Sequence, residues 1–240
     1  PFFSPQPFII PRRFAQPMAE VEPTWLLIDG YEDEPAAFGV PPYIGFHIRY
    51  IAGVFEAHKL PYEYITIDQW REIVRGANDI ADLNLERVQG VALLAGAVVP
   101  GKYLRGTPIS LRETKELLEL MPANIPFLAG GWAIRGWRHA GWSPLRANLF
   151  LTVQDTDATL DHFLRLGQWK HQRRTNEQWR EWAHHGATSK AVRENPDNGG
   201  PLTFEVELYQ GCVRYKNGCK FCIEPKKGVP IDRPVEDVLS

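Results

Sequence analysis

Short apolar runs alternate with segments of helical periodicity along the first two thirds of the chain. The apolar runs are 25–30, 62–68, 88–99, 125–131 and 149–153. The helical segments are 47–59, 69–78, 110–120 and 157–166. This alternation favours a parallel sheet whose strands are joined by right-handed helical crossovers.

The order of strand, loop and helix resembles that of flavodoxin-like domains, so we expect an α/β domain over residues 24–166. Ligands of open parallel sheets bind at the carboxyl ends of the strands. In this chain those ends carry Asp29-Gly30, Asp68, Ala95-Gly96 and Gly130-Gly131. This edge of the sheet is therefore the expected ligand side.

Three further regions flank that domain. Residues 1–23 hold six prolines and are expected to form an extended arm. Residues 167–200 are polar and basic, and we expect a helical linker that ends at the breaker 195–201. Residues 201–240 begin with the alternating stretch 202–208, which predicts a strand.

Composition excludes several classes. The net charge of −2 gives no bulk electrostatic case for nucleic acid, and no apolar run approaches the length of a membrane span. Free clustered thiols suit a reducing compartment, so we expect a cytoplasmic protein. Because the chain starts at Pro1 without a signal peptide, we expect a processed form or a fragment.

All three cysteines lie in the last thirty residues, at Cys212, Cys219 and Cys222. An odd number cannot form a fully paired disulfide framework. Clustered thiolates are what a soft metal centre needs, and Lys216 and Lys220 favour the thiolate form. Three ligands, rather than four, leave one coordination position open.

A strand ending in Gly211-Cys212, followed by Cys219-Lys-Phe-Cys222 and Ile-Glu-Pro, is similar to the radical S-adenosylmethionine (radical SAM) superfamily. The spacing C-x6-C-x2-C departs from the common C-x3-C-x2-C in the first gap. Segments 28–35, 39–43, 95–96, 99–103 and 106–108 resemble an archaeal-type group of that superfamily. Its members carry a cobalamin-binding-like domain, then a partial (β/α) barrel, then a helix-hairpin-helix.

The resemblance implies an oxidoreductase-type enzyme with a [4Fe-4S] cluster on Cys212, Cys219 and Cys222. S-adenosylmethionine would chelate the fourth iron, and Phe221 would lie near its adenine. With an electron donor, reductive cleavage would give a 5′-deoxyadenosyl radical that modifies a substrate, for which RNA and protein are both candidates. Residues 201–240 would be only the first unit of the barrel, so this chain alone is expected to be inactive.

Cobalamin is a separate question. Cobalt-ligating loops use Asp-x-His-x-x-Gly, whereas this chain reads Asp29-Gly-Tyr31-Glu-Asp. A histidine-ligated cobalamin is therefore not supported, and binding without such a ligand stays open. The loop 96–108 also lacks the hydroxyl residue of a P-loop, which argues against a nucleotide triphosphatase.

Two other classes of function remain alternatives. The cysteines could hold structural zinc with His184 or His185 as the fourth ligand, in a non-catalytic binding module. A simple electron carrier is the third interpretation.

Several weaker candidates accompany these alternatives. Loop anchoring is favoured over ligand stacking for Trp132, Trp137 and Trp142. A solvated helix face is favoured over phosphate contact for Lys170, His171, Arg173, Arg174 and Arg180. Acidic side chains that would face substrate are Glu205, Glu207 and Glu224.

Overall fold

The computed structural model describes residues 22–32, 39–40, 43–75, 85–96, 106–139, 148–153, 155–195, 203–220 and 224–239. Its strands are β1 (Thr24–Asp29), β2 (Tyr43–Ile44), β3 (Tyr62–Thr66), β4 (Val88–Leu94), β5 (Phe127–Gly130), β6 (Leu149–Leu151), β7 (Thr203–Phe204), β8 (Tyr209–Gln210) and β9 (Ile231–Asp232). Its α-helices are α1 (Phe46–Ala57), α2 (Ile67–Val74), α3 (Leu111–Leu120), α4 (Ala133–His139), α5 (Thr156–Leu166), α6 (Asn176–Ala187), α7 (Lys190–Arg193) and α8 (Val235–Leu239). Two short 3₁₀ turns are η2 (Leu85–Arg87) and η3 (Glu224–Lys227).

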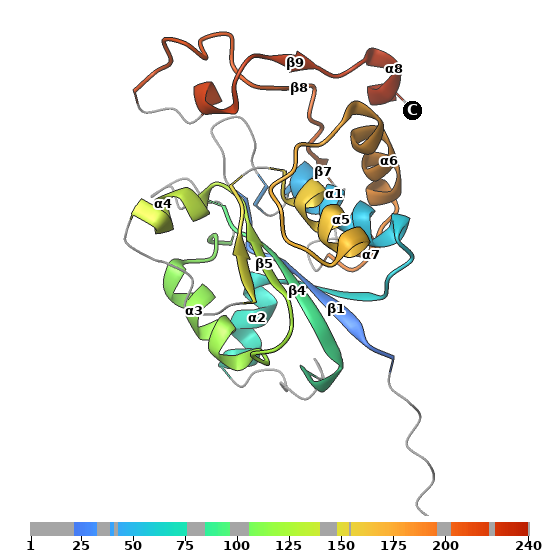
Figure 1. Cartoon of the computed structure of the whole chain (residues 1–240), viewed down its shortest axis with the longest axis vertical. Coiled ribbons are helices and arrows are strands. Elements are labelled where there is room, and N and C mark those ends of the chain that lie inside the picture. The colour runs from blue at the N-terminus through green and yellow to red at the C-terminus, as the bar shows by residue number, and fades with distance from the viewer. Residues whose placement is uncertain are drawn as a thin grey trace, which may run out of the picture.

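Within the described residues, five parallel strands form one sheet in the order β3-β1-β4-β5-β6 (Figure 1). Counted along the chain this is the order 2-1-3-4-5, which is consistent with a flavodoxin-like fold. The order reverses between β1 and β4, where such sheets bind ligands. The expected parallel α/β sheet is thereby confirmed.

Helices cover both faces of the sheet (Figure 1). Leu26 and Ile28 of β1 belong to a core with residues of α2, α3 and α4. Trp25 and Leu27, on the opposite face of the same strand, belong to a core with α1, α5 and α6. Burial on both faces explains why the strand is an uninterrupted apolar run.

Capping residues set the ends of two helices. The Thr66 hydroxyl accepts a hydrogen bond from Gln69 N, and Thr66 N in turn donates one to Gln69 Oε1. This capping box starts α2 at Ile67, two residues earlier than the periodicity predicts, and so ends β3 at Thr66. The capping box expected at Ser110 and Glu113 is present at the start of α3.

The stretch expected as a linker contains α6 and α7, and α6 packs directly on α1. A Cβ on Gly53 of α1 would lie 2.1 Å from the Trp182 carbonyl oxygen of α6. A Cβ on Gly186 of α6 would lie 2.2 Å from the Arg49 carbonyl oxygen of α1. The two glycines therefore allow an approach that any side chain would prevent, and Trp179 and Trp182 are buried at this contact.

The C-terminal segment, residues 203–239, crosses above the carboxyl ends of the sheet (Figure 1). The strand expected at 202–208 is present only as β7, which pairs in parallel with β2. After four residues without regular structure, β8 pairs antiparallel with β9. A complete β/α unit is not formed by these elements. The described part of the segment instead packs against the α/β domain as an extended chain with short strands (Figure 1).

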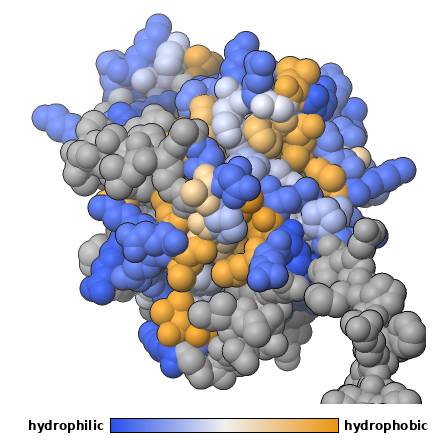
Figure 2. All heavy atoms as spheres, turned by 60° about the horizontal axis from the view of Figure 1, so that its bottom comes forward, coloured by the Kyte–Doolittle hydropathy of each residue, from blue (hydrophilic) through white to orange (hydrophobic). Residues whose placement is uncertain are grey.

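Several sequence expectations lie outside the described residues. They are the arm up to residue 21, the glycine-rich stretch 97–105, Trp142, Phe221 and Cys222. Among the helices that are described, none combines the length and apolarity needed to cross a bilayer. Figure 2 brings the amino ends of the strands forward and shows groups of hydrophobic side chains separated by hydrophilic ones.

Candidate functional site

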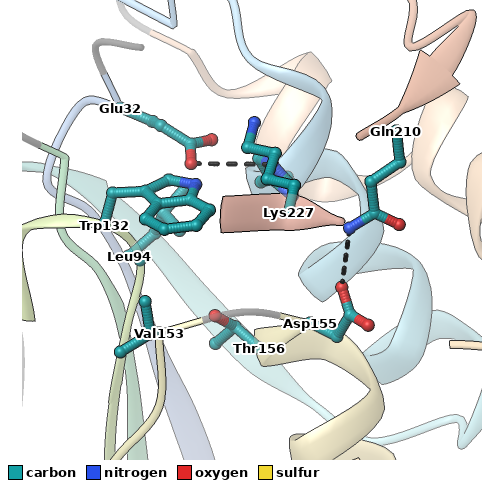
Figure 3. A pocket seen from close by; sticks show the side chains of 10 residues that line it. Glu32, Leu94, Trp132, Val153, Asp155, Thr156, Gln210 and Lys227 are labelled. Carbon is teal, nitrogen blue, oxygen red and sulfur yellow. Dashed lines mark hydrogen bonds and ion pairs between the residues drawn. The ribbon is translucent and has the colours of Figure 1, made fainter. Parts of the chain in front are cut away.

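A cavity lies between the carboxyl ends of the strands and the C-terminal segment (Figure 3). Its lining includes Glu32 after β1, Leu94 of β4, Gly131 and Trp132 after β5, Asp155 before α5, and Gln210 and Lys227 of the C-terminal segment. The empty volume is about 280 Å³, part of it open to solvent. This is the edge of the sheet at which the sequence predicts a ligand, and the strand order reverses beside it.

Charged and aromatic groups converge on the cavity. The Lys227 ammonium lies 5.4 Å from the centre of the Trp132 ring, and His47 Nε2 lies 3.6 Å from Glu32 Oε1. Figure 3 shows Glu32, Trp132 and Lys227 pointing toward one another. Burial, reinforced by the nearby cations Arg174 and Lys227, holds the pKa of His47 well below its usual value. The imidazole is therefore neutral near pH 7, with one ring nitrogen that donates a hydrogen bond and one that accepts.

Asp29 lies at the end of β1 but is bound within the protein. Its Oδ1 accepts a hydrogen bond from Tyr31 N at 3.0 Å, and its Oδ2 accepts one from the Tyr64 hydroxyl at 3.0 Å. Burial raises the pKa of Asp29 to about 6, although both hydrogen bonds act in the opposite direction. Of the strand-end residues expected at the ligand edge, Gly131 lines the cavity, whereas Asp29 supports the turn after β1 and Asp68 lies in α2.

The cysteine loop, defined here as residues 211–227, has both ends at this cavity. Gln210 precedes the loop, and its Nε2 donates a hydrogen bond to Asp155 Oδ1 at 3.3 Å (Figure 3). Lys227 ends the loop over Trp132. Pairing of β8 with β9 and a hydrogen bond from Cys212 N to Gly228 O at 3.0 Å close the neck of the loop.

Gly211 is required at this neck. Its φ is +105°, a conformation that residues with a side chain rarely adopt. A Cβ there would also lie 2.5 Å from the Val229 carbonyl oxygen. The glycine before the first cysteine thus lets two chain segments meet at the base of the loop.

The described thiols suit a soft metal. Cys212 is partly exposed, Cys219 is exposed, and neither forms a disulfide. Arg214 N donates a hydrogen bond to Cys212 Sγ at 3.3 Å, the type of contact that stabilises a ligating thiolate. Lys216 is in the same loop, with its ammonium 5.6 Å from the Tyr215 ring. Accessible sulfurs in a basic, glycine-containing loop fit an iron–sulfur cluster.

The third expected ligand, Cys222, and the expected adenine contact, Phe221, lie outside the described residues. In the part of the chain that is described, no three His, Cys, Asp or Glu side chains come together as a metal site. His184 and His185 lie on α6, with ring centres 5.9 Å apart, and belong to no such described group. The complete ligand set stays a prediction.

A buried ion cluster connects the α/β domain to the C-terminal segment. Arg174 Nη1 lies 2.5 Å from Asp157 Oδ2, and Arg174 Nη2 lies 3.4 Å from Glu207 Oε2 and 3.9 Å from Asp155 Oδ1. None of the four side chains is more than 5% exposed. Burial raises the pKa of Glu207 to about 7, with Arg174 opposing that rise and Asp157 adding to it.

The expectation of a solvated face is wrong for Arg174, whose side chain is buried, whereas Lys170, His171, Arg173 and Arg180 are exposed. The carboxylates at the start of α5, Asp155 and Asp157, were the only local signal for a cation. Their partner, Arg174, is 17 residues beyond Asp157 and 19 beyond Asp155, and only the tertiary structure brings it to them.

The other weak candidates have structural roles. Glu205 Oε1 accepts a hydrogen bond from Gly39 N at 2.9 Å, and Trp137 is part of the core. Arg180 pairs with Asp237 of α8 at 2.5 Å. Trp132 is the one tryptophan among the described lining residues of the cavity.

The residues after β1 do not fit a cobalt site. Tyr31 stands where the histidine of a cobalt-ligating loop would be, is 2% exposed, and donates its hydroxyl to Asp68 Oδ2 at 3.2 Å. The empty volume of about 280 Å³ includes open solvent, and a corrin is far too large for the space that remains between these side chains. We derive no chemistry through cobalamin.

Comparison with known proteins gives archaeal relatives without an assigned activity. An uncharacterized protein of Methanocaldococcus jannaschii is 36% identical over 228 residues, covering 90% of this chain and 40% of the relative. An uncharacterized protein of Archaeoglobus fulgidus is 33% identical over 216 residues, covering 89% of this chain and 36% of the relative. The chain thus spans about two fifths of the length of these relatives. No family model matches it.

Proposed function

We propose that the chain is part of a radical SAM enzyme, in which the cysteine loop holds an open-site [4Fe-4S] cluster. The observation that carries this proposal is the position of the loop. Both of its ends, at Gln210 and Lys227, line the cavity at the carboxyl edge of the sheet. A cluster on the loop would therefore lie beside a small recess at the carboxyl edge of the sheet rather than on a remote surface.

The chain's own residues would bind and orient the reactants. Cys212, Cys219 and Cys222 would supply three thiolates, and Phe221 would contact the adenine of S-adenosylmethionine. When bound, the cluster supplies the electron that cleaves the sulfonium of S-adenosylmethionine. The Arg214 N–H that reaches Cys212 Sγ would stabilise the anionic sulfur.

The cavity would receive part of the substrate. Trp132 offers an aromatic face, while the neutral His47 and the Glu32 carboxylate offer hydrogen-bonding groups. A protein or a nucleic acid would have to enter between the C-terminal segment and the sheet, because Lys227 and Gln210 cover the cavity from above (Figure 3).

Exposed apolar side chains support the assignment of residues 201–240 as the start of a partial barrel. Val206, Leu208, Val229 and Ile231 of the C-terminal segment are each at least 50% exposed. Large apolar side chains close together mark surfaces that pack against other structure. In relatives more than twice as long, additional β/α units would cover them.

Anaerobic reconstitution tests the function. We expect a brown protein with about four irons per chain, as a cubane cluster requires. We also expect its visible and electron paramagnetic resonance spectra to change when S-adenosylmethionine is added, because the open iron gains two ligands. The chain with its cluster is expected to need a separate electron donor for this reaction. We also expect the protein to be cytoplasmic.

The alternatives give different results in the same experiment. Stoichiometric zinc, with no iron retained after reconstitution, would show a structural metal in a binding module. A redox-active cluster whose spectra ignore S-adenosylmethionine would show an electron carrier. Either result would overturn the proposed enzyme.

A further inference from the structure

We propose that Arg174 is a positioning residue for the cysteine loop, acting through Glu207 and through the aromatic pair Tyr50–Trp179. The inference rests on the proposed function in one respect, namely that the loop carries the reactive metal centre. The contacts that support it are independent of any metal.

The first strand of the loop's neck is held by Glu207. This residue lies two positions before β8, and its carboxylate is 3.4 Å from Arg174 Nη2. Arg174 in turn is fixed by Asp157 at 2.5 Å and by a hydrogen bond from its own backbone N to Asp155 Oδ2 at 3.2 Å. Asp155 also accepts the hydrogen bond of Gln210, so the same cluster contacts the chain just before β8, at Glu207, and at the last residue of β8.

The second strand of the neck is held by Arg233, directly after β9. Its backbone N donates to Leu208 O at 2.8 Å, and its guanidinium carbon lies 5.3 Å from the Trp179 ring centre. The guanidinium carbon of Arg174 lies 5.1 Å from the same ring and 4.7 Å from Tyr50. Arg174 of the α/β domain and Arg233 of the C-terminal segment thus contact the same aromatic pair, Tyr50 and Trp179, which we call the aromatic platform.

The platform itself is rigid. Trp179 Nε1 donates a hydrogen bond to the Tyr50 hydroxyl at 2.9 Å, and both residues are buried between α1 and α6. Buried charged groups tolerate few arrangements, because each one needs its partner to offset the loss of water. The cluster therefore specifies where the neck of the loop sits on the sheet domain.

A second ion pair between the same two regions offers a matched control. Arg180 of α6 binds Asp237 of α8 at 2.5 Å; the Asp237 side chain is 6% exposed, but the Arg180 side chain is 55% exposed, so water reaches one side of the pair. Exposed pairs contribute little to stability. Asp237 is also 25 residues beyond Cys212 along the chain, past the neck of the loop.

The test measures thiol reactivity in the metal-free full chain under reducing conditions. Iodoacetamide alkylates the chain, and mass spectrometry gives the alkylation rate at Cys212 and at Cys219. The variants are Glu207→Ala, Glu207→Gln and Asp237→Ala, and each is measured at a temperature below its own unfolding transition. In Glu207→Ala we expect Cys212 alkylation to rise about tenfold, since losing a hydrogen bond to a charged group raises the locally opened population by roughly that factor. We expect Glu207→Gln, which keeps a hydrogen-bonding side chain, to restore most of the slow rate.

Cys219, which is already exposed, should change less than about twofold in all three variants. Asp237→Ala should leave both cysteines at the wild-type rates. Equal Cys212 rates in Glu207→Ala and the wild type would overturn the inference, as would an equal increase in Asp237→Ala. Arg174→Met provides a stronger variant of the same test wherever it folds.

The result is separable from that of the proposed function. If reconstitution yields zinc while Glu207→Ala still accelerates Cys212 alkylation, the positioning role stands and the radical SAM assignment fails. If iron and the response to S-adenosylmethionine are present but Cys212 is unaffected, the assignment stands and the positioning role fails. When the cluster is bound, we expect its electron paramagnetic resonance spectrum in Glu207→Ala to differ from that in the wild type.

Discussion

Gln210 Nε2 donates a hydrogen bond to Asp155 Oδ1 at 3.3 Å, and this contact joins the residue two places before Cys212 to the residue that caps α5. Asp155 has a left-handed backbone conformation, with φ of +46°, which directs its carboxylate away from the usual capping position. The carboxylate serves the C-terminal segment instead of its own helix. The carboxyl edge of the sheet thereby acts as the support for the cysteine loop.

Glu207 should make the stability of the chain depend on pH. Its pKa is about 7 in the folded protein against an ordinary value of 4.5. The folded state therefore binds the proton more tightly, and the stabilisation is lost as pH rises from about 4.5 through about 7. Glu207→Gln lacks this titration. When the pH is raised from 5 to 8, the difference in unfolding free energy between Glu207→Gln and the wild type should therefore change by about 1–3 kcal/mol in favour of the variant.

Urea unfolding at the two pH values measures this difference. Glu181→Gln, on the exposed side of α6, is the control and should show no such relative change. Parallel pH dependence in the wild type and Glu207→Gln would contradict the prediction.

Tyr64→Phe should weaken the turn after β1. The Tyr64 hydroxyl donates to Asp29 Oδ2 at 3.0 Å and accepts from Asn195 Nδ2 at 3.2 Å. Removing it leaves buried polar groups without this partner, at a cost of about 1–3 kcal/mol in unfolding free energy. The pKa of Asp29, about 6 in the wild type, should rise further because a hydrogen bond to the carboxylate is lost.

Denaturant unfolding and carboxyl-carbon NMR titration check both parts of this prediction. Tyr209→Phe, on the exposed strand β8, should change neither quantity. An unchanged Asp29 titration in Tyr64→Phe would show that the hydroxyl does not act on the carboxylate.

Gly53→Ala should separate α1 from α6. The added Cβ would lie 2.1 Å from the Trp182 carbonyl oxygen, and backbone cannot move aside as a flexible side chain can. We expect a loss of about 1–3 kcal/mol in unfolding free energy, as for other overpacked sites. Gly136→Ala on α4 meets nothing within 4 Å and should instead stabilise the chain by up to about 1 kcal/mol through helix propensity. Thermal unfolding of the two variants would show opposite shifts, and shifts of the same sign would contradict the packing argument.

Each cysteine should be needed for metal binding. Cys212→Ser, Cys219→Ser and Cys222→Ser should each retain less than about half of the wild-type iron after reconstitution, because serine is a poor ligand for this centre. His184→Ala and His185→Ala should retain all of it. Iron and zinc analysis by mass spectrometry distinguishes the outcomes, and zinc that is present in the wild type but lost in a histidine variant would favour the binding module.

Much of the α/β domain could be predicted from local sequence. The buried strands are continuous apolar runs because both of their faces are covered, and Ser110 with Glu113 marks the start of α3 through hydrogen bonds that span three residues. The strand ends were less predictable. Ile67 and Asp68 continue the pattern of β3, but the cap at Thr66 assigns them to a helix.

The site was only partly predictable. The cysteine spacing and the carboxyl edge of the sheet are visible in the sequence, since each depends on residues close together in the chain. Arg174 and Trp179 appear there as members of a basic, aromatic stretch with no distinguishing pattern. Their burial comes from contacts with Tyr50, Asp157 and Glu207, which are 17 to 129 residues away along the chain.

The sequence alone determined that the chain alternates strands with helices, that its thiols are grouped in one glycine-containing loop, and that they are too few for a paired framework. Local hydrophobic periodicity and spacing suffice for these properties, because neighbouring residues produce them. Only the tertiary structure decided that the loop's two ends meet at the cavity and that a buried arginine holds them there. Those contacts depend on the desolvation of charges brought together from distant segments, and that free energy exists only after the sheet and its helices have packed.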